Sequence, residues 1–209
     1  MPALTPLAFW FLRHGETDWN AQGLSQGNID IPLNPSGLAQ AYAAASMLRN
    51  RGIATIVASP LSRAYATAVI AAQRLGLAVD IDNDLREVSF GAQEGQKMAQ
   101  WFNDWVAGTF TPEGAESFVD LRARAVVAVN RALRRPSPVL VVAHGALFRA
   151  LRAEMGLEPN VRTANASPLF CESGLPAWTL TPAEMLVPAR REAAVQRADA
   201  DQHQPQPQE

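Results

Sequence analysis

Two of the chain's three histidines occur in the same setting, directly after an apolar run and directly before a glycine. Residues 9–13 precede His14, and residues 139–143 precede His144. Apolar runs of this length, rich in β-branched or aromatic residues, are typical of buried strands. Open α/β sheets place their active sites at the carboxyl ends of their strands. The pattern therefore predicts a cleft faced by two imidazoles, which can serve as nucleophile, acid or base.

Two arginines could bring positive charge to the same cleft. Arg13 directly precedes His14, although by itself it is equally well explained as a surface cation. Arg63 falls in the first turn of a predicted helix, where the helix dipole disfavours a cation. A bound phosphate would remove that conflict, because a helix N-terminus and a guanidinium both favour this anion. The alternative is a solvated Arg63 paired with an acid such as Glu87.

A carboxyl group and a helix start complete the set of candidate residues. Glu87 lies in a predicted loop after a strand, where it could act as a general acid, although most loop glutamates are simply exposed. Gly145 permits close approach of the backbone. The N–H groups that follow His144, including that of Ala146, would be free to meet an anion at the start of the next helix.

A metal site is an alternative use of the same histidines. His14 and His144 together with Glu16 or Glu87 could form a site for a divalent ion. However, the neighbouring arginines would repel a metal, and the chain has no His-x-His or His-Glu-x-x-His spacing. We therefore expect neither a metal nor a cofactor.

Length and composition limit the class of protein. The chain has 209 residues, 48% of them hydrophobic, with a net charge of −2, which predicts one domain with a substantial core and no nucleic-acid partner. No segment approaches the ~18 apolar residues of a membrane span, so we expect a cytoplasmic protein without a membrane partner. The single cysteine, Cys171, is expected to be a packed thiol. The oligomeric state is left open.

Strand-like and helix-like segments alternate along the chain. Strands are expected at residues 8–13, 55–58, 78–81, 138–143, 163–170 and 177–181, and helices at 36–50, 63–75, 95–107, 116–134 and 146–155. In the first helix, Ser36 is the expected N-cap, with Leu38 and Tyr42 on the apolar face. This order predicts an α/β three-layer sandwich, with a mostly parallel central sheet covered by helices on both faces. We expect residues 188–209 to form a disordered tail.

Four segments of the chain resemble the histidine phosphatase superfamily, in its phosphoglycerate mutase-like branch. They are residues 12–20 (LRHGETDWN), residues 59–64 (SPLSRA) with Thr67, residues 85–91 (LREVSFG) and residues 142–145 (VAHG). Their order and spacing match over about residues 8–181. The resemblance implies a phosphoglycerate mutase-like catalytic domain over residues 1–187, with a small helical cap at about 92–120.

The resemblance also implies a role for each candidate residue. The expected catalytic residues are His14, Glu87 and His144: His14 would be the nucleophile, Glu87 would protonate the leaving oxygen and then help to activate water, and His144 would bind the phosphoryl oxygens. Together with the N–H groups considered above, the expected substrate-binding residues are Arg13, Asn20, Arg63, His144, Gly145 and Ala146. Phosphoryl transfer mainly requires in-line positioning and charge stabilisation, which these groups can supply without a metal.

The segment around the expected acid favours a phosphatase over a mutase. Cofactor-dependent phosphoglycerate mutases usually have Glu-Arg-His-Tyr-Gly here, whereas this chain has Val88 and Ser89 after Glu87. The interval from Gly91 to Pro138 is also short, and it lacks the paired arginines near the start of the mutases' cap insertion. We therefore expect a metal-independent phosphomonoester hydrolase acting on a small phosphorylated metabolite.

Three questions remain open from the sequence. A cofactor-dependent phosphoglycerate mutase is one alternative function, and a non-catalytic phospho-ligand-binding protein on the same fold is another. The third concerns the aromatic residues of segment 95–118. At helical spacing such residues are more often core than a platform for a ligand.

Overall fold

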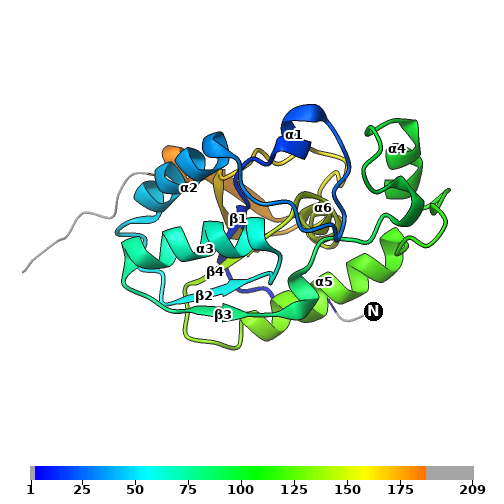
Figure 1. The fold of residues 1–209 in the computed structure, drawn as a ribbon. Helices are drawn as coiled ribbons and strands as arrows, with labels where there is room; N and C mark the ends of the chain where they lie inside the picture. Colours follow the sequence, from blue (N-terminus) through cyan, green and yellow to red (C-terminus); the bar gives the residue numbers. More distant parts are fainter. Residues whose placement is uncertain (1–2, 187–209) are drawn as a thin grey trace, which may run out of the picture.

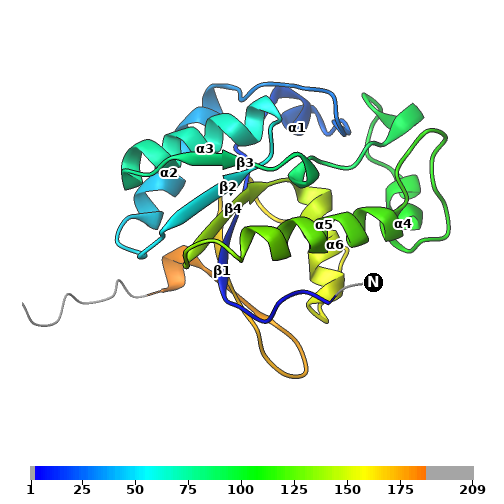
Figure 2. The same ribbon diagram turned by 90° about the horizontal axis from the view of Figure 1, so that it is seen from below.

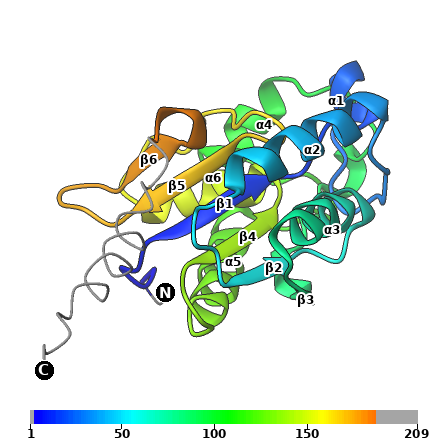
Figure 3. The same cartoon turned by 90° about the vertical axis from the view of Figure 1, so that its left-hand side faces the viewer.

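A computed structural model describes residues 3–186 and builds them around one six-stranded sheet (Figure 1). The strands are β1 (Phe9–Arg13), β2 (Thr55–Ala58), β3 (Val79–Ile81), β4 (Val139–Ala143), β5 (Pro168–Glu172) and β6 (Thr179–Pro182). Their order across the sheet is β3-β2-β4-β1-β5-β6, which Figure 3 shows in one view. The pairs β2–β3, β2–β4 and β1–β4 are parallel, whereas β5 and β6 add an antiparallel edge.

Helices cover both faces of this sheet. They are α1 (Asp18–Gln22), α2 (Pro35–Leu48), α3 (Ser62–Leu75), α4 (Gln100–Val106), α5 (Phe118–Ala132) and α6 (Gly145–Glu154). Helices α2 and α3 lie together on one face and α5 and α6 on the other, while α4 stands beyond the sheet (Figures 1 and 2). The predicted α/β sandwich with a mostly parallel central sheet is therefore confirmed.

The period-two alternation of strand side chains builds two hydrophobic cores, one on each face. Trp10 and Leu12 of β1 belong to the core under α2 and α3, and Phe9 and Phe11 belong to the core under α5 and α6. Phe11 stacks on Phe148 of α6 with ring centroids 4.0 Å apart. Apolar runs without alternation were the correct signal for β1 and β4, because both faces of these strands are covered.

The adjacency of the parallel strands β1, β4 and β2 brings their carboxyl ends to one edge. Beyond the end of β1, the His14 N–H donates to the carbonyl of Ala143 at 3.0 Å. The Ser59 N–H donates in the same way to the carbonyl of Val142 at 3.0 Å. The ladder therefore continues past the strands and fixes His14, Ser59 and His144 at this edge.

Helix α2 differs from the prediction in its cap and in its buried face. Its N-cap is Asn34, whose Oδ1 accepts a hydrogen bond from the Gly37 N–H at 2.7 Å, and Pro35 occupies the first helical position. The expected cap, Ser36, lies inside the helix. Leu38 and Tyr42 are 43% and 60% exposed, because the helix packs through small residues instead. Its buried residues are Gly37, Ala41, Ala44, Ala45 and Leu48.

The predicted helix at 95–107 is shorter than expected. Residues 95–98 pair with the chain after α1: the Gly95 N–H donates to the Ser25 carbonyl at 2.8 Å, and Leu24 and Lys97 form a β-bridge. Gly95 has a φ of 78°, which a helix does not allow. Helix α4 therefore begins only at Gln100. Helix α1 was not predicted, since five residues are too few to show a helical period.

The aromatic residues around α4 are mainly core, as expected. Trp105 is fully buried, and its ring contacts those of Phe90, Phe102 and Phe118. Phe110 is exposed. This cluster anchors α4 to α5 beside the carboxyl edge of the sheet.

Three remaining predictions concern the rest of the chain. Cys171 is a packed thiol, and its burial raises the pKa of the sulfur well above the usual range. None of the helices within residues 3–186 is long and apolar enough to cross a membrane. The tail expected at 188–209 lies outside the described residues.

Candidate active site

A pocket of about 470 Å³ opens at the carboxyl edge of the sheet. The residues predicted from separate parts of the sequence that meet on its wall are Arg13, His14, Asn20, Arg63, Glu87, Gly145 and Ala146. His144 lies next to this wall, fully buried, with its ring centroid 5.2 Å from that of His14. The structure thus gathers all of the predicted site residues around one pocket.

His14 is a neutral imidazole with a fixed tautomer. Its Nδ1 lies 2.7 Å from the carbonyl oxygen of Gly15. Since a carbonyl only accepts, Nδ1 carries the proton and Nε2 carries the lone pair. Burial, together with the positive charges of Arg13 and Arg63, holds the pKa of His14 well below its usual range. The lowered pKa favours the neutral ring, in which Nε2 carries an unprotonated lone pair.

His144 is held from the opposite ring nitrogen. Its Nε2 lies 2.7 Å from the hydroxyl of Ser59, while its Nδ1 is buried and has no hydrogen-bond partner among the described residues. Burial and then the positive charge of Arg63 lower the pKa of His144 well below its usual range. Ser59 begins the second sequence motif, so its contact explains why that motif must lie beside the second histidine.

Arg63 is an internal cation and not a solvated one. It is 1% exposed, and its two terminal nitrogens donate to the carbonyls of Ile29 and Gly27, both at 2.8 Å. Its Nε is buried without a partner, and it forms no ion pair within the part of the chain that the structure describes. The alternative of a solvated Arg63 paired with Glu87 is therefore wrong. Neutral carbonyls orient the guanidinium but leave its charge available to a ligand.

Arg13 approaches the pocket across a glycine. Its Nη1 donates to the carbonyl of Thr163 at 2.6 Å, and its Nε is buried with no hydrogen-bond partner in the described part of the chain. A Cβ added at Gly145 would lie 3.2 Å from that Nε, so the glycine makes room for the guanidinium. Burial lowers the pKa of Arg13 to about 10, which leaves the group positively charged at neutral pH.

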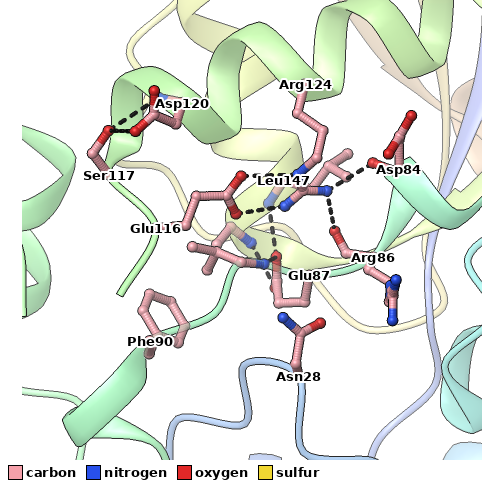
Figure 4. Close-up of polar contacts among 12 residues, drawn as sticks. Asn28, Asp84, Arg86, Glu87, Phe90, Glu116, Ser117, Asp120, Arg124 and Leu147 are labelled. Atoms are coloured by element: carbon pink, nitrogen blue, oxygen red, sulfur yellow. Dashed lines mark hydrogen bonds and ion pairs between the residues drawn. The ribbon is translucent and has the colours of Figure 1, made fainter. Parts of the chain in front are cut away.

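The chain's own carboxylates occupy both helix N-termini at which a bound anion was predicted. At α3, Asp30 accepts hydrogen bonds from the Ser62 N–H and hydroxyl at 2.8 and 2.7 Å. At α6, Glu87 accepts from the N–H of Ala146 at 3.0 Å and from the N–H of Leu147 at 3.0 Å, the latter labelled in Figure 4. The expectation that the Ala146 N–H is free for an external anion is therefore wrong here. The dipole argument was sound, but the anions come from the protein itself.

The loop that carries Glu87 is fastened by a residue that the sequence analysis did not single out. Arg124 of α5 donates through Nη1 to the carbonyls of Asp84 and Arg86, at 2.7 and 2.9 Å (Figure 4). Its Nε and Nη2 donate to the carboxylate of Glu116 at 2.8 and 2.6 Å. This bidentate pair holds the guanidinium rigid, which in turn fixes the backbone on either side of Leu85. Glu87 itself is 8% exposed.

Asn20 is oriented by its own neighbours. Its Oδ1 accepts hydrogen bonds from the Thr17 N–H at 3.3 Å and from the Asn165 side chain at 3.1 Å. Asn165 also donates to the carbonyl of His14 at 3.0 Å. With the oxygen engaged in this way, the amide nitrogen of Asn20 is the group left for a ligand.

The pocket extends outward beyond these residues. The further wall includes Phe90, Met98, Ala99, Phe102, Asn103, Arg149, Asn160 and Arg162, which the sequence analysis did not assign to the site. Phe90 lies in the third sequence motif and Met98 and Ala99 precede α4, whereas the others come from α4, from α6 and from the loop after α6, where no local signal marks them. Within residues 3–186, no group of three or more histidine, cysteine or acidic side chains is placed to hold a metal ion.

Comparison with known proteins places these features in a family. The profile of the histidine phosphatase superfamily (branch 1) matches residues 9–166. Glucosyl-3-phosphoglycerate phosphatase of Mycobacterium tuberculosis is 38% identical over 165 residues, which are 69% of this chain and 73% of that protein. A Yersinia pestis protein named probable phosphoglycerate mutase GpmB is 38% identical over 178 residues, which are 77% of this chain and 82% of that protein.

A solved structure agrees with the family match. A mycobacterial glucosyl-3-phosphoglycerate phosphatase in complex with inorganic phosphate superposes with a TM-score of 0.70 at 34% identity, covering 83% of this chain and 95% of that one. The profile covers both histidines and all four motifs. The chain therefore belongs to the histidine phosphatase superfamily, branch 1.

Proposed function

We propose that this protein hydrolyses a small phosphomonoester and that His14 carries the phosphoryl group between the two halves of the reaction. The observation that carries the proposal is the arrangement of nitrogen atoms around the pocket. Among the described residues, the lone pair on Nε2 of His14 is free, and three buried nitrogens nearby have no hydrogen-bond partner: Arg13 Nε, Arg63 Nε and His144 Nδ1. Buried donors without partners are costly, and phosphate oxygens would satisfy the two guanidinium N–H groups and, in the tautomer in which the Ser59 hydroxyl donates to Nε2, the Nδ1–H of His144.

In the first half-reaction, His14 Nε2 attacks phosphorus while the bond from phosphorus to the ester oxygen breaks. The leaving oxygen takes a proton from the carboxyl group of Glu87. Arg13, Arg63 and His144 stabilise the charge on the three non-bridging oxygens, and the Asn20 amide assists. The two guanidinium groups supply this charge before the substrate arrives.

In the second half-reaction, water attacks the same phosphorus and the bond to His14 breaks. The Glu87 carboxylate accepts the proton of that water, so that phosphate leaves and His14 returns neutral. Gly145 remains in the proposed binding set because its backbone lies against Arg13. Ala146 does not, because its N–H is held by Glu87. We place these residues in one catalytic domain, 1–187, with a cap at about 92–120.

The phosphoglycerate mutase reaction is the second candidate, favoured by the 38% identity to the Yersinia protein. The two reactions differ only in which hydroxyl, of water or of a second substrate, accepts the phosphoryl group. Val88 and Ser89 replace the polar pair that usually follows the acid in the mutases. The mycobacterial relative is named for phosphatase activity, which supports water as the acceptor.

The experiment supplies 3-phosphoglycerate with a trace of the 2,3-bisphosphate in excess chelator, and follows 2-phosphoglycerate and free phosphate together. We expect phosphate to be released with little isomer. Isomer forming much faster than phosphate would establish the mutase. Loss of activity on chelation, restored by a divalent ion, would contradict the metal-independent mechanism. The His14→Ala chain, purified in the same way, controls for contaminating phosphatases.

A further inference from the structure

The outer part of the pocket holds a second pair of arginines that phosphoryl transfer does not need. Arg149 lies on α6 and Arg162 in the loop that follows it, and both line the pocket. Neither makes a hydrogen bond through its side chain, or an ion pair, within residues 3–186, and the Nε of Arg149 is buried without a partner. The Arg149 guanidinium instead lies over the ring of Phe102, with Cζ 4.8 Å from the centroid.

The charges around the pocket do not balance with a phosphoryl group alone. Its lining contains four arginines and a single carboxylate, that of Glu87, among the described residues. A phosphomonoester carries at most two negative charges and Glu87 at most one, so at least one positive charge of this lining remains without a counterion, and two remain when Glu87 is the protonated acid. Burial lowers the pKa of Arg149, the negative charge of Glu87 partly offsets this, and the positive charges of Arg162 and Arg152 lower it further. A further anion beside these side chains would relieve both the desolvation and the repulsion.

The position of Arg149 on α6 relates it to the proposed phosphoryl site. Arg149 follows Gly145 by four residues, which places it on the same face of α6, about 6 Å further along the axis. Gly145 lies against the Arg13 guanidinium, where the phosphoryl group is proposed to bind. A carboxylate a few bonds away from a phosphate ester spans such a distance. The planar carboxylate also suits a guanidinium fork.

The mouth of the pocket is fixed near the second pair of arginines. Asn160 donates through Nδ2 to Oδ1 of Asn103 at 2.9 Å, and this bond joins the loop after α6 to helix α4. Arg162 lies two residues further along that loop. The bond therefore holds the loop that carries Arg162 beside α4, the helix whose Phe102 lies under the Arg149 guanidinium.

From these observations we infer that Arg149 and Arg162 form a subsite for a carboxylate of the substrate, and that the substrate class is a phosphorylated hydroxy acid or a larger derivative of one. This inference rests on the proposed function. It assigns substrate selection to residues outside the phosphoryl-binding group.

The test compares two substrates that differ only at the inferred subsite. 3-Phosphoglycerate has a carboxylate where glycerol 3-phosphate has a neutral CH2OH group. Because charge-assisted hydrogen bonds would form only with the carboxylate, we expect kcat/KM of the parent to be about 10- to 100-fold higher for 3-phosphoglycerate than for glycerol 3-phosphate. Arg149→Met and Arg162→Met should each remove most of this preference, mainly through KM. Their activity on 4-nitrophenyl phosphate should stay within about two-fold.

Two further variants control for lost folding and for general charge effects. Arg149→Lys keeps the positive charge but loses the planar pair of donors of the guanidinium, and should retain part of the preference for 3-phosphoglycerate. Arg134→Met makes the same change of charge at an exposed position after α5, beyond the opposite edge of the sheet, and should keep the full preference. An equal loss on all three substrates in Arg149→Met would assign that residue to the phosphoryl group or to stability, and would overturn the subsite.

A binding measurement separates this inference from the proposed function. Calorimetry with the His14→Ala chain measures affinity for 3-phosphoglycerate and glycerol 3-phosphate without turnover. Suppose that the parent protein hydrolyses no monoester, while the His14→Ala variant binds 3-phosphoglycerate more tightly than glycerol 3-phosphate. The proposed function then fails and the subsite stands. If it hydrolyses 4-nitrophenyl phosphate yet neither binds nor hydrolyses 3-phosphoglycerate better than glycerol 3-phosphate, the subsite is refuted and the hydrolase remains.

Discussion

The inner and outer parts of the pocket hold their arginines in opposite ways. Arg63, in the inner part, is 1% exposed and donates to two backbone carbonyls. In the outer part, Arg162 is exposed, and Arg149 is held mainly by the ring of Phe102. The inner guanidinium is thus fixed before any ligand arrives, whereas the terminal donors of the outer pair make no hydrogen bond within residues 3–186.

This difference separates the chemistry from the choice of substrate. A fixed charge is worth most where the reacting phosphoryl group must be met in one geometry, because no reorganisation is then needed in the transition state. Donors with freedom to adjust suit a part of the substrate that varies. Changes at the inner part should therefore affect every substrate, and changes at the outer part only some.

The largest effect should come from the nucleophile. His14→Ala removes the nitrogen that attacks phosphorus, so turnover should fall by about 10⁴-fold or more on every monoester. Steady-state release of phosphate measures this loss. Rapid quenching without acid, with a ³²P-labelled substrate, should trap label on His14 of the parent. Label found on His144 would reverse the assignment of the two histidines. If the loss of activity in His14→Ala differed between substrates, the contrast between the inner and outer parts of the pocket would be contradicted.

A smaller effect that depends on the leaving group is expected at Glu87. Glu87→Gln keeps the size of the side chain but cannot donate a carboxyl proton. General acid catalysis is typically worth about 10²–10⁴-fold, so kcat on an alkyl phosphate should fall by that factor. The fall should be much smaller on 4-nitrophenyl phosphate, whose leaving oxygen needs no proton. An equal fall on both substrates would assign Glu87 to positioning, through its bonds to the start of α6.

The smallest effect should come from outside the pocket. Arg124→Met removes the hydrogen bonds to the carbonyls of Asp84 and Arg86, so Glu87 should lose its placement. We expect kcat on alkyl phosphates to fall by about 10-fold, with little change on 4-nitrophenyl phosphate, because misplacing a catalytic group is costly only where that group acts.

The matched control for Arg124 is on the same helix. Arg122 pairs with Glu154 of α6 and has no hydrogen bond to the loop that carries Glu87. Arg122→Met should therefore leave both activities unchanged, and Arg124→Lys should recover part of the loss. If Arg124→Met lowers both activities equally, together with its thermal stability, Arg124 has a structural role alone.

The sequence predicted the inner part of the pocket better than the outer part. His14 and His144 were found because covered strands leave a continuous apolar run, and parallel neighbours end at one edge. Arg149 and Arg162 were missed because their significance depends on how α4 packs against α6. An arginine in a helix has no local signature that marks it as lacking a partner.

The carboxylates at the N-termini of α3 and α6 show a different limit of prediction from sequence. The placement of Arg63 in a first turn correctly indicated a negative charge near α3, but Asp30, which supplies it, lies 32 residues from its partner Ser62. Glu87 is likewise 59 residues from Ala146. Dipole arguments predict the sign of a missing charge, and only the tertiary fold decides whether a ligand or the chain itself provides it.

The hydrogen bond from His14 Nδ1 to the Gly15 carbonyl fixes the regiochemistry of the proposed intermediate. With Nδ1 committed as a donor, the phosphoramidate can form only at Nε2. The same ring orientation serves the free and the phosphorylated enzyme, so the imidazole has no need to flip between the two half-reactions. The ring also keeps its Nδ1 proton throughout, and it leaves each catalytic cycle in the tautomer with which it began.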